Sequence, residues 1–173
     1  MEYFSFYDLP VSFVLDKKKL RRLFLLKSKE YHPDFYTLES EEKQAEILAL
    51  STLNNEAYKV LSDEEKRLKY ILTQKGLIGE GIKNTMPPSF LMETMDINEQ
   101  IMELQFDFDA QKHQQLLAIV AQKETDLDTR GQQLFANFGE INQEEQKKLE
   151  EIRDYYLQKR YLLRLKENIA QFG

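Results

Sequence analysis

The apolar residues of this chain recur three and four positions apart in nearly every long segment, which is typical of one face of an α-helix. In the first half of the chain this spacing predicts one helical turn over residues 3–9 and helices over about 17–31, 40–61 and 63–75. Residues 34–40 are expected to form a loop, because a proline ends the helix before them.

Capping residues mark where two of these helices should begin. Asp16 can cap the helix over 17–31, and the run Ser62-Asp63-Glu64-Glu65 can cap the helix over 63–75. The side chains expected to face the core are Leu20, Leu23, Phe24 and Leu26 in the first helix, Ala45, Leu48, Ala49, Leu53, Ala57, Tyr58 and Leu61 in the second, and Leu68, Ile71 and Leu72 in the third.

The composition changes after residue 75. The stretch GLIGEGIKNTMPPS holds three of the six glycines and two of the four prolines, so we place a linker at 76–88, between a domain over 1–75 and a domain over 89–173. Beyond the linker, the spacing predicts helices over about 89–106, 109–137 and 142–171, with Gly139 supplying a break. Long helices joined by short loops form antiparallel bundles, so the chain is predicted to be all-α with a C-terminal three-helix bundle.

The helix predicted over 89–106 carries more apolar surface than a three-helix core requires. At about 100° per residue, one stripe contains Phe90, Ile97, Ile101, Leu104 and Phe108, and a nearly opposite stripe contains Leu91, Met92, Met95, Met102 and Phe106, with Glu99 among them. The second stripe either packs against the first domain or a neighbouring helix, or forms an exposed patch for a partner protein. Three methionines favour the patch, because flexible thioethers adapt to a partner surface.

Charge and composition restrict the classes of function. The chain carries a net charge of −6, which argues against general nucleic-acid binding, because such binding depends on neutralised phosphates. The charge is uneven, since residues 17–29 are strongly basic, and this favours one local contact with an acidic partner surface. The absence of cysteine excludes disulfides, thiolate metal sites and cysteine nucleophiles.

Candidate catalytic chemistry is sparse. The two histidines, His32 and His113, lie in different predicted domains, so a metal site built from both is not expected. The sequence shows neither a nucleophile elbow nor a local Ser/His/Asp motif. We therefore expect no enzyme activity and no cofactor.

The stretch YHPDF, residues 31–35, separates the basic helix from the next helix. On one interpretation Pro33 only ends a helix, and Asp34 only forms a turn. On the other, the tripeptide lies at the tip of a helical hairpin, where the proline stiffens the turn. His32 and Asp34 would then be exposed polar groups available to a partner, for example to a partner arginine.

The residues around this tripeptide resemble a known family. The segments YFSFYDLP, the basic helix, YHPDF and LNNEAYKVLSDEEKRLKYIL resemble a J-domain, which is a helical hairpin with short flanking helices. With the linker and SFLMETMDINEQI added, nearly the entire chain resembles the HscB family of iron–sulfur co-chaperones. Many J-domains carry lysine or arginine where this chain has Leu25 and Leu26.

The resemblance implies a co-chaperone with two binding surfaces. The J-domain would bind a 70-kDa heat-shock class chaperone and stimulate its ATPase, and the second domain would bind the scaffold protein on which iron–sulfur clusters are assembled. The chaperone-binding residues implied are His32, Pro33, Asp34, Arg22, Lys27 and Lys29. The scaffold-binding residues implied are Leu91, Met92, Met95, Asp96 and Glu99, with Tyr155 as the aromatic contact chosen among Tyr155, Tyr156 and Tyr161.

Several alternatives stay open at this point. The chain could be a general J-domain co-chaperone that presents unfolded clients, or a non-catalytic helical adaptor, and an enzyme is a distant third. Longer family members carry a zinc segment with cysteines, which this chain lacks, so we expect no metal. No apolar run could span a bilayer and the N-terminus does not resemble a secretory signal, so we expect a bacterial cytoplasmic protein, or a mitochondrial-matrix one if the chain is a processed eukaryotic protein.

Overall fold

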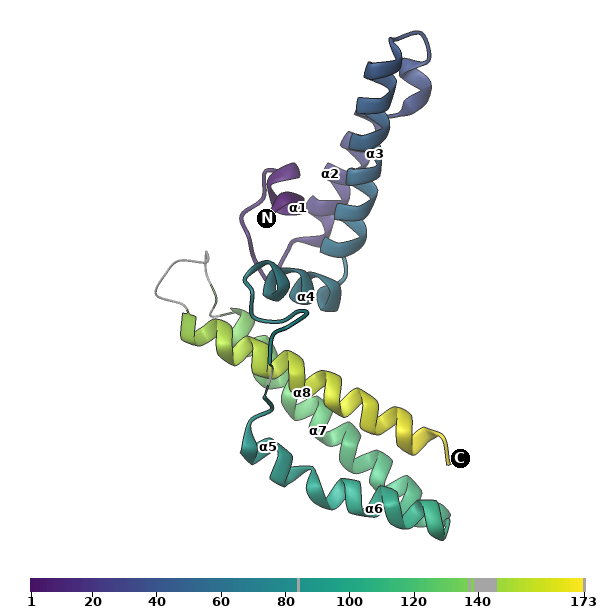
Figure 1. Ribbon diagram of the computed structural model, residues 1–173, viewed down its shortest axis with the longest axis vertical. Coiled ribbons are helices and arrows are strands. Elements are labelled where there is room, and N and C mark those ends of the chain that lie inside the picture. Colours follow the sequence, from purple (N-terminus) through teal and green to yellow (C-terminus); the bar gives the residue numbers. More distant parts are fainter. Residues whose placement is uncertain (84, 137, 139–145, 173) are drawn as a thin grey trace. The chain divides into compact units, whose positions relative to one another are not determined.

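The computed structural model describes residues 1–83, 85–136, 138 and 146–172, and every element of regular secondary structure in these residues is a helix (Figure 1). The prediction of an all-α chain is confirmed. The helices are α1 (Glu2–Phe6), α2 (Lys17–Glu30), the 3₁₀ helix η1 (Pro33–Tyr36), α3 (Glu41–Leu61), α4 (Glu64–Gln74), α5 (Pro88–Glu93), α6 (Met95–Phe106), α7 (Ala110–Ala136) and α8 (Gln146–Ala170). They form two compact units, the first built from residues 1–76 and the second mainly from 77–136 and 146–172.

Side-chain caps set the starts of the long helices. The Asp16 carboxylate accepts hydrogen bonds from the backbone N–H groups of Lys18 (2.8 Å) and Lys19 (3.0 Å), and Asp63 caps α4 in the same way, as the sequence predicts. These backbone N–H groups hold the pKa of Asp16 below its ordinary value. The stabilisation that this cap provides is therefore fully present at pH values above the pKa of Asp16 in the unfolded chain. It is lost as the pH falls through the lower pKa that Asp16 has in the folded protein.

In the first unit, α2 and α3 form an antiparallel hairpin, and Figure 1 shows its tip extending beyond α1 and α4. The core of the unit is formed by buried apolar side chains, namely Phe4, Tyr7, Phe13, Leu20, Ile47, Ala57, Leu61, Leu68, Ile71 and Leu72. None of them lies between Tyr31 and Ser40, so the tip is outside the packed core.

A buried asparagine joins three helices of this core. The amide of Asn54 on α3 donates to the Phe24 carbonyl (3.2 Å) and to the Ser28 hydroxyl (2.9 Å) on α2. Its side-chain oxygen accepts from the Tyr7 hydroxyl (2.7 Å), which follows α1. Burial raises the pKa of Tyr7, so the hydroxyl stays protonated and continues to donate. A buried amide with all these partners fixes how α2 lies along α3.

A buried arginine closes the base of the hairpin. The guanidinium of Arg67 on α4 donates to the Phe13 carbonyl through Nε (3.1 Å) and Nη2 (3.0 Å), and to the Leu61 carbonyl at the end of α3 through Nη1. The bond to Leu61 satisfies a carbonyl group that the end of α3 leaves without an intrahelical donor, and the bonds to Phe13 hold the segment before α2 against α4. Burial lowers the pKa of Arg67, but an arginine remains charged at neutral pH.

The predicted inner faces of α2 and α3 are partly wrong. Leu26, Ala45, Leu48 and Ala49 are exposed, whereas Ile47 and Asn54 are buried. The buried set on α3 is Ile47, Asn54, Ala57 and Leu61, so the helix is rotated relative to the prediction. The reason is Asn54, a polar residue that apolar spacing cannot assign to a core, and whose hydrogen bonds determine which face of α3 turns inward.

In the second unit, α7 and α8 pack along each other and α6 packs against both (Figure 1). The single helix predicted over 89–106 is instead two, α5 and α6, separated at Thr94. The Thr94 hydroxyl is buried and donates to the carbonyls of Phe90 (3.0 Å) and Leu91 (3.1 Å), and such local bonds compete with helical ones. The predicted break at Gly139 and the start of the last helix at 142 lie outside the described residues.

Close packing between α7 and α8 centres on Gly131 and Tyr155. A Cβ atom added to Gly131 would lie 2.4–2.9 Å from three atoms of the Tyr155 ring, so only glycine fits there. The Tyr155 hydroxyl donates to Asp128 (2.8 Å), which also binds Lys159 (2.6 Å). Burial, together with the hydrogen bond to Asp128, raises the pKa of Tyr155 to about 12.

Replacing Asn54 by alanine should destabilise the first unit by about 2–3 kcal/mol, because buried groups on α1 and α2 lose their partner. Asn55, its exposed neighbour on α3, provides the matched control, and Asn55→Ala should be nearly neutral. The chain has no tryptophan, so amide hydrogen exchange in α2 and α3 is the suitable measurement. Equal protection in the two variants would contradict the role given to Asn54.

Replacing Gly131 by alanine should destabilise the second unit by about 1–3 kcal/mol, although alanine is the better helix former, because the added methyl group overlaps the Tyr155 ring. Amide exchange in α7 and α8 measures the effect. Combining Gly131→Ala with Tyr155→Leu should cost less than the sum of the two single changes, since the shorter side chain leaves room for the methyl group. Strict additivity would show that the close contact is not the cause.

Candidate functional site

The HPD tripeptide lies at the tip of the hairpin, between α2 and η1. His32 caps η1, and its Nδ1 atom accepts a hydrogen bond from the backbone N–H of Asp34 (3.3 Å). Pro33 occupies the first turn of η1, where its fixed torsion suits a helix start. Because Nδ1 accepts a hydrogen bond, a neutral His32 ring carries its proton on Nε2 and can donate to a partner through that atom.

The carboxylate of Asp34 is available to a partner. Its side chain is 82% exposed, and the nearest His32 ring nitrogen, Nδ1, lies 3.8 Å from its Oδ2 atom. Neither side chain packs in a core, so their placement comes from the backbone of the turn. The tip thus presents the Nε2 donor of His32 and the Asp34 carboxylate on an exposed surface and not in a pocket.

Hydrogen bonds on both sides of the tip hold the turn in place. The Tyr36 hydroxyl donates to the Glu30 carbonyl at the end of α2 (2.8 Å). From α3, the Gln44 amide donates to the carbonyls of Thr37 (3.3 Å) and Glu39 (2.9 Å). The loop predicted over 34–40 therefore begins as a 3₁₀ turn and is fixed to both helices. Sequence reasoning did not identify Tyr36 and Gln44, because neither lies in the tripeptide.

The three basic candidates on α2 do not share one face. Arg22 and Lys29 are seven positions apart, which places them on the same exposed face of the helix. Lys27 lies on another side, where its ammonium group is 4.6 Å from the centre of the Phe6 ring and 5.4 Å from that of Tyr31. Lys27 therefore also packs within the unit through cation–π contacts.

Two exposed leucines lie between Arg22 and Lys29. Leu25 and Leu26 complete the helical spacing i, i+3, i+4, i+7, and their exposed fractions are 55% and 57%. Leu26 was expected in the core, but it is exposed, because Leu20, Leu23 and Phe24 form the inner side of α2. The outer face of α2 is consequently basic at both ends and apolar in its middle.

The second candidate surface runs along α5 and α6. The residues of one stripe, Phe90, Ile97, Ile101 and Leu104, are buried, and those of the other, Leu91, Met92, Met95, Met102 and Phe106, are exposed. The prediction of two stripes is confirmed, except that Phe108, assigned to the inner stripe, is half exposed. We call the exposed set the outer stripe. Its exposed fraction reaches 73% at Met92 and 92% at Phe106.

Acidic side chains accompany the outer stripe. Asp96 and Glu99 are exposed on the first turns of α6, and Glu103 follows one turn later. Glu103 lies 3.6 Å from Lys112, an exposed pair of low strength. A partner that covers this stripe would therefore meet an apolar centre bordered by negative charge.

Tyr155 does not belong to this surface. Only 5% of the residue is exposed, and its ring packs on Gly131 and Phe135 of α7 while its hydroxyl binds Asp128. Its contact with a partner stays a prediction, and the structure leaves only a small part of the side chain exposed for one. Tyr161, one of the two alternatives, instead accepts a hydrogen bond from Asn98 of α6.

The second histidine has a structural partner. The Nε2 atom of His113 lies 3.0 Å from the Ile169 carbonyl and links the start of α7 to the end of α8. In the described part of the chain, no three histidine, cysteine or acidic side chains are grouped closely enough to hold a metal ion. Within the same residues, no helix is both long and apolar enough to cross a membrane.

Comparison with known proteins finds relatives over most of the chain. Residues 86–170 match the family model described as the HSCB C-terminal oligomerisation domain. The co-chaperone protein HscB homolog of Vibrio parahaemolyticus is 32% identical over 139 residues, which cover 73% of this chain and 81% of that protein. The homolog of Vibrio vulnificus is 35% identical over 112 residues, which cover 64% of this chain and 66%, just under two thirds, of that protein.

Solved structures agree with these sequence relations. The crystal structure of the human co-chaperone protein HscB matches with a TM-score of 0.68 and 28% identity, over 99% of this chain and 81% of that chain. The chaperone HscB from Vibrio cholerae matches with a TM-score of 0.62 over 99% of this chain and 96% of that chain, and at 23% identity it supports the fold alone. The sequence matches and the shared fold together show that the chain belongs to the HscB family of co-chaperones.

Proposed function

We propose that the first unit binds a 70-kDa heat-shock class chaperone and stimulates its ATP hydrolysis, and that the second unit binds the scaffold protein of iron–sulfur cluster assembly and delivers it to that chaperone. The chain itself carries out no bond chemistry in this proposal. The observation that carries it is the hairpin tip, where His32 and Asp34 are exposed while Tyr36 and Gln44 hold the turn. An exposed and fixed polar tip suits a contact surface.

The chaperone contact would combine the tip with the outer face of α2. Asp34 would accept charge-assisted hydrogen bonds from a basic group of the chaperone, and Arg22 and Lys29 would meet acidic groups. Leu25 and Leu26 would be buried in the same contact and add apolar area between the two cations. The charges would set orientation and association rate, and the leucines would add affinity.

The scaffold contact would use the outer stripe, with Leu91, Met92 and Met95 as its centre and Asp96 and Glu99 at its border. Large exposed apolar side chains on a single helix face mark a binding surface in a folded protein. A second copy of this chain is the competing occupant, because the matching family model is described as an oligomerisation domain. A scaffold protein on the outer stripe predicts a complex of two different chains, and a second copy predicts a homodimer.

The variant Asp34→Asn should abolish stimulation of the chaperone ATPase while leaving the fold intact, because the exposed carboxylate contributes little to packing. A steady-state ATPase assay measures the effect, and circular dichroism checks the fold. Glu39→Gln removes the same charge from the same loop, and its rate should match that of the unchanged chain. Full stimulation by Asp34→Asn would refute the proposed use of the tip.

The double variant Leu91→Ala with Met92→Ala should weaken scaffold binding by about tenfold or more, because apolar anchors at the centre of an interface contribute most of its affinity. Basal ATPase stimulation should persist, since these residues lie in the other unit. Ile119→Ala, on α7 outside the outer stripe, is the matched control for an exposed apolar residue.

Calorimetric titration with the scaffold and sedimentation of the chain alone separate the two occupants. Unchanged scaffold affinity combined with loss of a dimer would assign the outer stripe to self-association. Unchanged values in both measurements would remove any binding role for Leu91 and Met92.

A further inference from the structure

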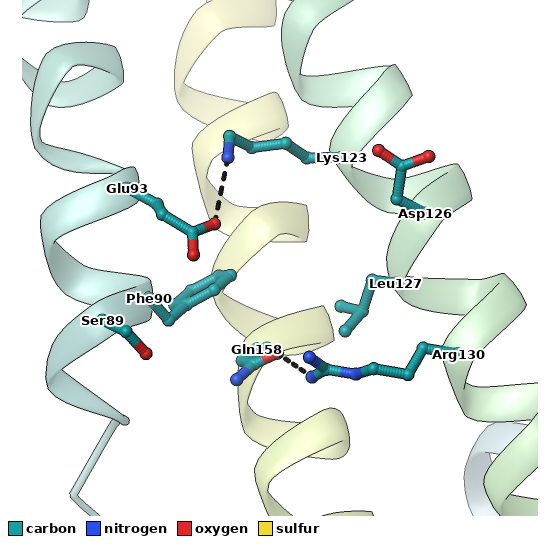
Figure 2. Close-up of a pocket in the computed structure, with 8 residues that line it drawn as sticks. All are labelled: Ser89, Phe90, Glu93, Lys123, Asp126, Leu127, Arg130 and Gln158. Atoms are coloured by element: carbon teal, nitrogen blue, oxygen red, sulfur yellow. Dashed lines mark hydrogen bonds and ion pairs between the residues drawn. The ribbon is translucent and has the colours of Figure 1, made fainter.

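The second unit contains a cavity of about 300 Å³ that neither proposed contact surface uses. Figure 2 shows its walls, which come from α5, α7 and α8. The residues that line it are Ser89, Phe90, Glu93, Lys123, Asp126, Leu127, Arg130 and Gln158. Its apolar part is formed by Phe90 and Leu127, both buried.

One of the two acidic side chains of the lining, Glu93, is paired with a cation, and the other, Asp126, keeps its charge and lies on the far side of Leu127 from Arg130 (Figure 2). The Glu93 carboxylate lies 3.3 Å from the Lys123 ammonium group and links α5 to α7 at one end of the cavity. The Asp126 carboxylate accepts a hydrogen bond from the Gln122 amide at 2.8 Å. Arg130, at the other end, has no carboxylate within ion-pair distance among the described residues, and its one hydrogen bond there runs to the neutral Gln158. The Arg130 end is therefore the cationic end.

Gln158 contributes a buried donor that lacks an acceptor. The residue is 6% exposed, and its Oε1 atom accepts from Nη2 of Arg130 at 2.6 Å. No acceptor in the described part of the chain takes a hydrogen bond from its Nε2 amide, which Figure 2 shows on the side away from Arg130. A buried polar group without a partner is rare in folded proteins and calls for a ligand or an ordered water.

We propose that this cavity binds a carboxylate group, which accepts a hydrogen bond from Arg130 through one oxygen and from the Gln158 Nε2 amide through the other. The carbon chain of the ligand would lie on Phe90 and Leu127. A planar carboxylate with two acceptor oxygens suits two neighbouring N–H donors, one of them charged. The carboxylate could belong to a free small organic acid or to an acidic side chain of a docked protein, and both sources offer the same chemistry.

The first experiment titrates the full-length ¹⁵N-labelled chain with sodium propionate and follows the side-chain amide signal of Gln158. Saturable shifts beyond those caused by sodium chloride at equal ionic strength support the proposal. A capped Gly-Glu-Gly peptide, whose only carboxylate is a side chain, forms the second arm. Binding of propionate alone identifies free acids as the source, and binding of the peptide as well extends the site to protein side chains. If neither ligand shifts the signal more than chloride does, the proposal is wrong.

Variants test the two donors separately. Arg130→Met keeps the aliphatic stem but removes the donors, and Gln158→Leu removes the buried amide, so each should weaken propionate binding by about tenfold or more. Arg164→Met removes the same charge from α8 outside the lining and should bind as the unchanged chain does. The substitutions remove the side-chain amide signal of Gln158 or change its surroundings. Binding is therefore measured in all variants from the backbone amide signals of α5.

Two outcomes would overturn the assignment. Unaltered propionate binding in both Arg130→Met and Gln158→Leu would place the ligand elsewhere. If Gln158→Leu raises the Tm and leaves propionate binding unaltered, the Gln158 amide of the unchanged chain binds only water and is not part of a carboxylate site. If Arg130→Met does not fold, Arg130→Lys keeps the charge but loses the planar donor pair, and its affinity should still fall severalfold. The proposal stands independently of chaperone and scaffold binding.

Discussion

The hydrogen bonds of Asn54 determine how the first unit is assembled. This one side chain binds α2 through Phe24 and Ser28 and meets the hydroxyl of Tyr7 after α1, so three segments far apart in the sequence share a single buried amide. Apolar contacts tolerate small rotations of a helix, but a satisfied buried amide does not. The face of α3 that carries Asn54 turns inward, and Leu48 consequently lies on the exposed side of the helix. The surface of the hairpin is therefore a consequence of its polar interior.

The two units expose apolar residues in different ways. On α2, two leucines stand between two cations, so apolar area is embedded in positive charge. On α5 and α6, exposed methionines follow one another along two successive helices, with acidic side chains beside them. The two surfaces thus differ in the sign of their charge and in the flexibility of their apolar side chains. In the proposed function, this difference would keep one partner from binding at the other partner's site.

Periodicity predicted much of this structure because most faces are decided by apolar contacts. The two stripes of α5 and α6 follow from apolar spacing, and the caps at Asp16 and Asp63 follow from the type of residue that precedes each helix. It failed where a polar group decides the geometry, as Asn54 does for α3 and Thr94 does between α5 and α6. Tyr155 shows another limit, since one sequence cannot tell an aromatic residue packed on a glycine from one that faces a partner.

At the hairpin tip, the side chains that fix the backbone are different from the exposed side chains that a partner could contact. Tyr36 and Gln44 fix the backbone through hydrogen bonds that involve neither the imidazole of His32 nor the carboxylate of Asp34. Substitution of the exposed Asp34 side chain would therefore leave the backbone of the turn in place, whereas substitution of His32 would also remove the cap of η1. A chain altered at Asp34 would accumulate normally and still offer its other surfaces. In the proposed function, a chain altered at the tip would therefore still bind the scaffold and compete with the intact protein for it.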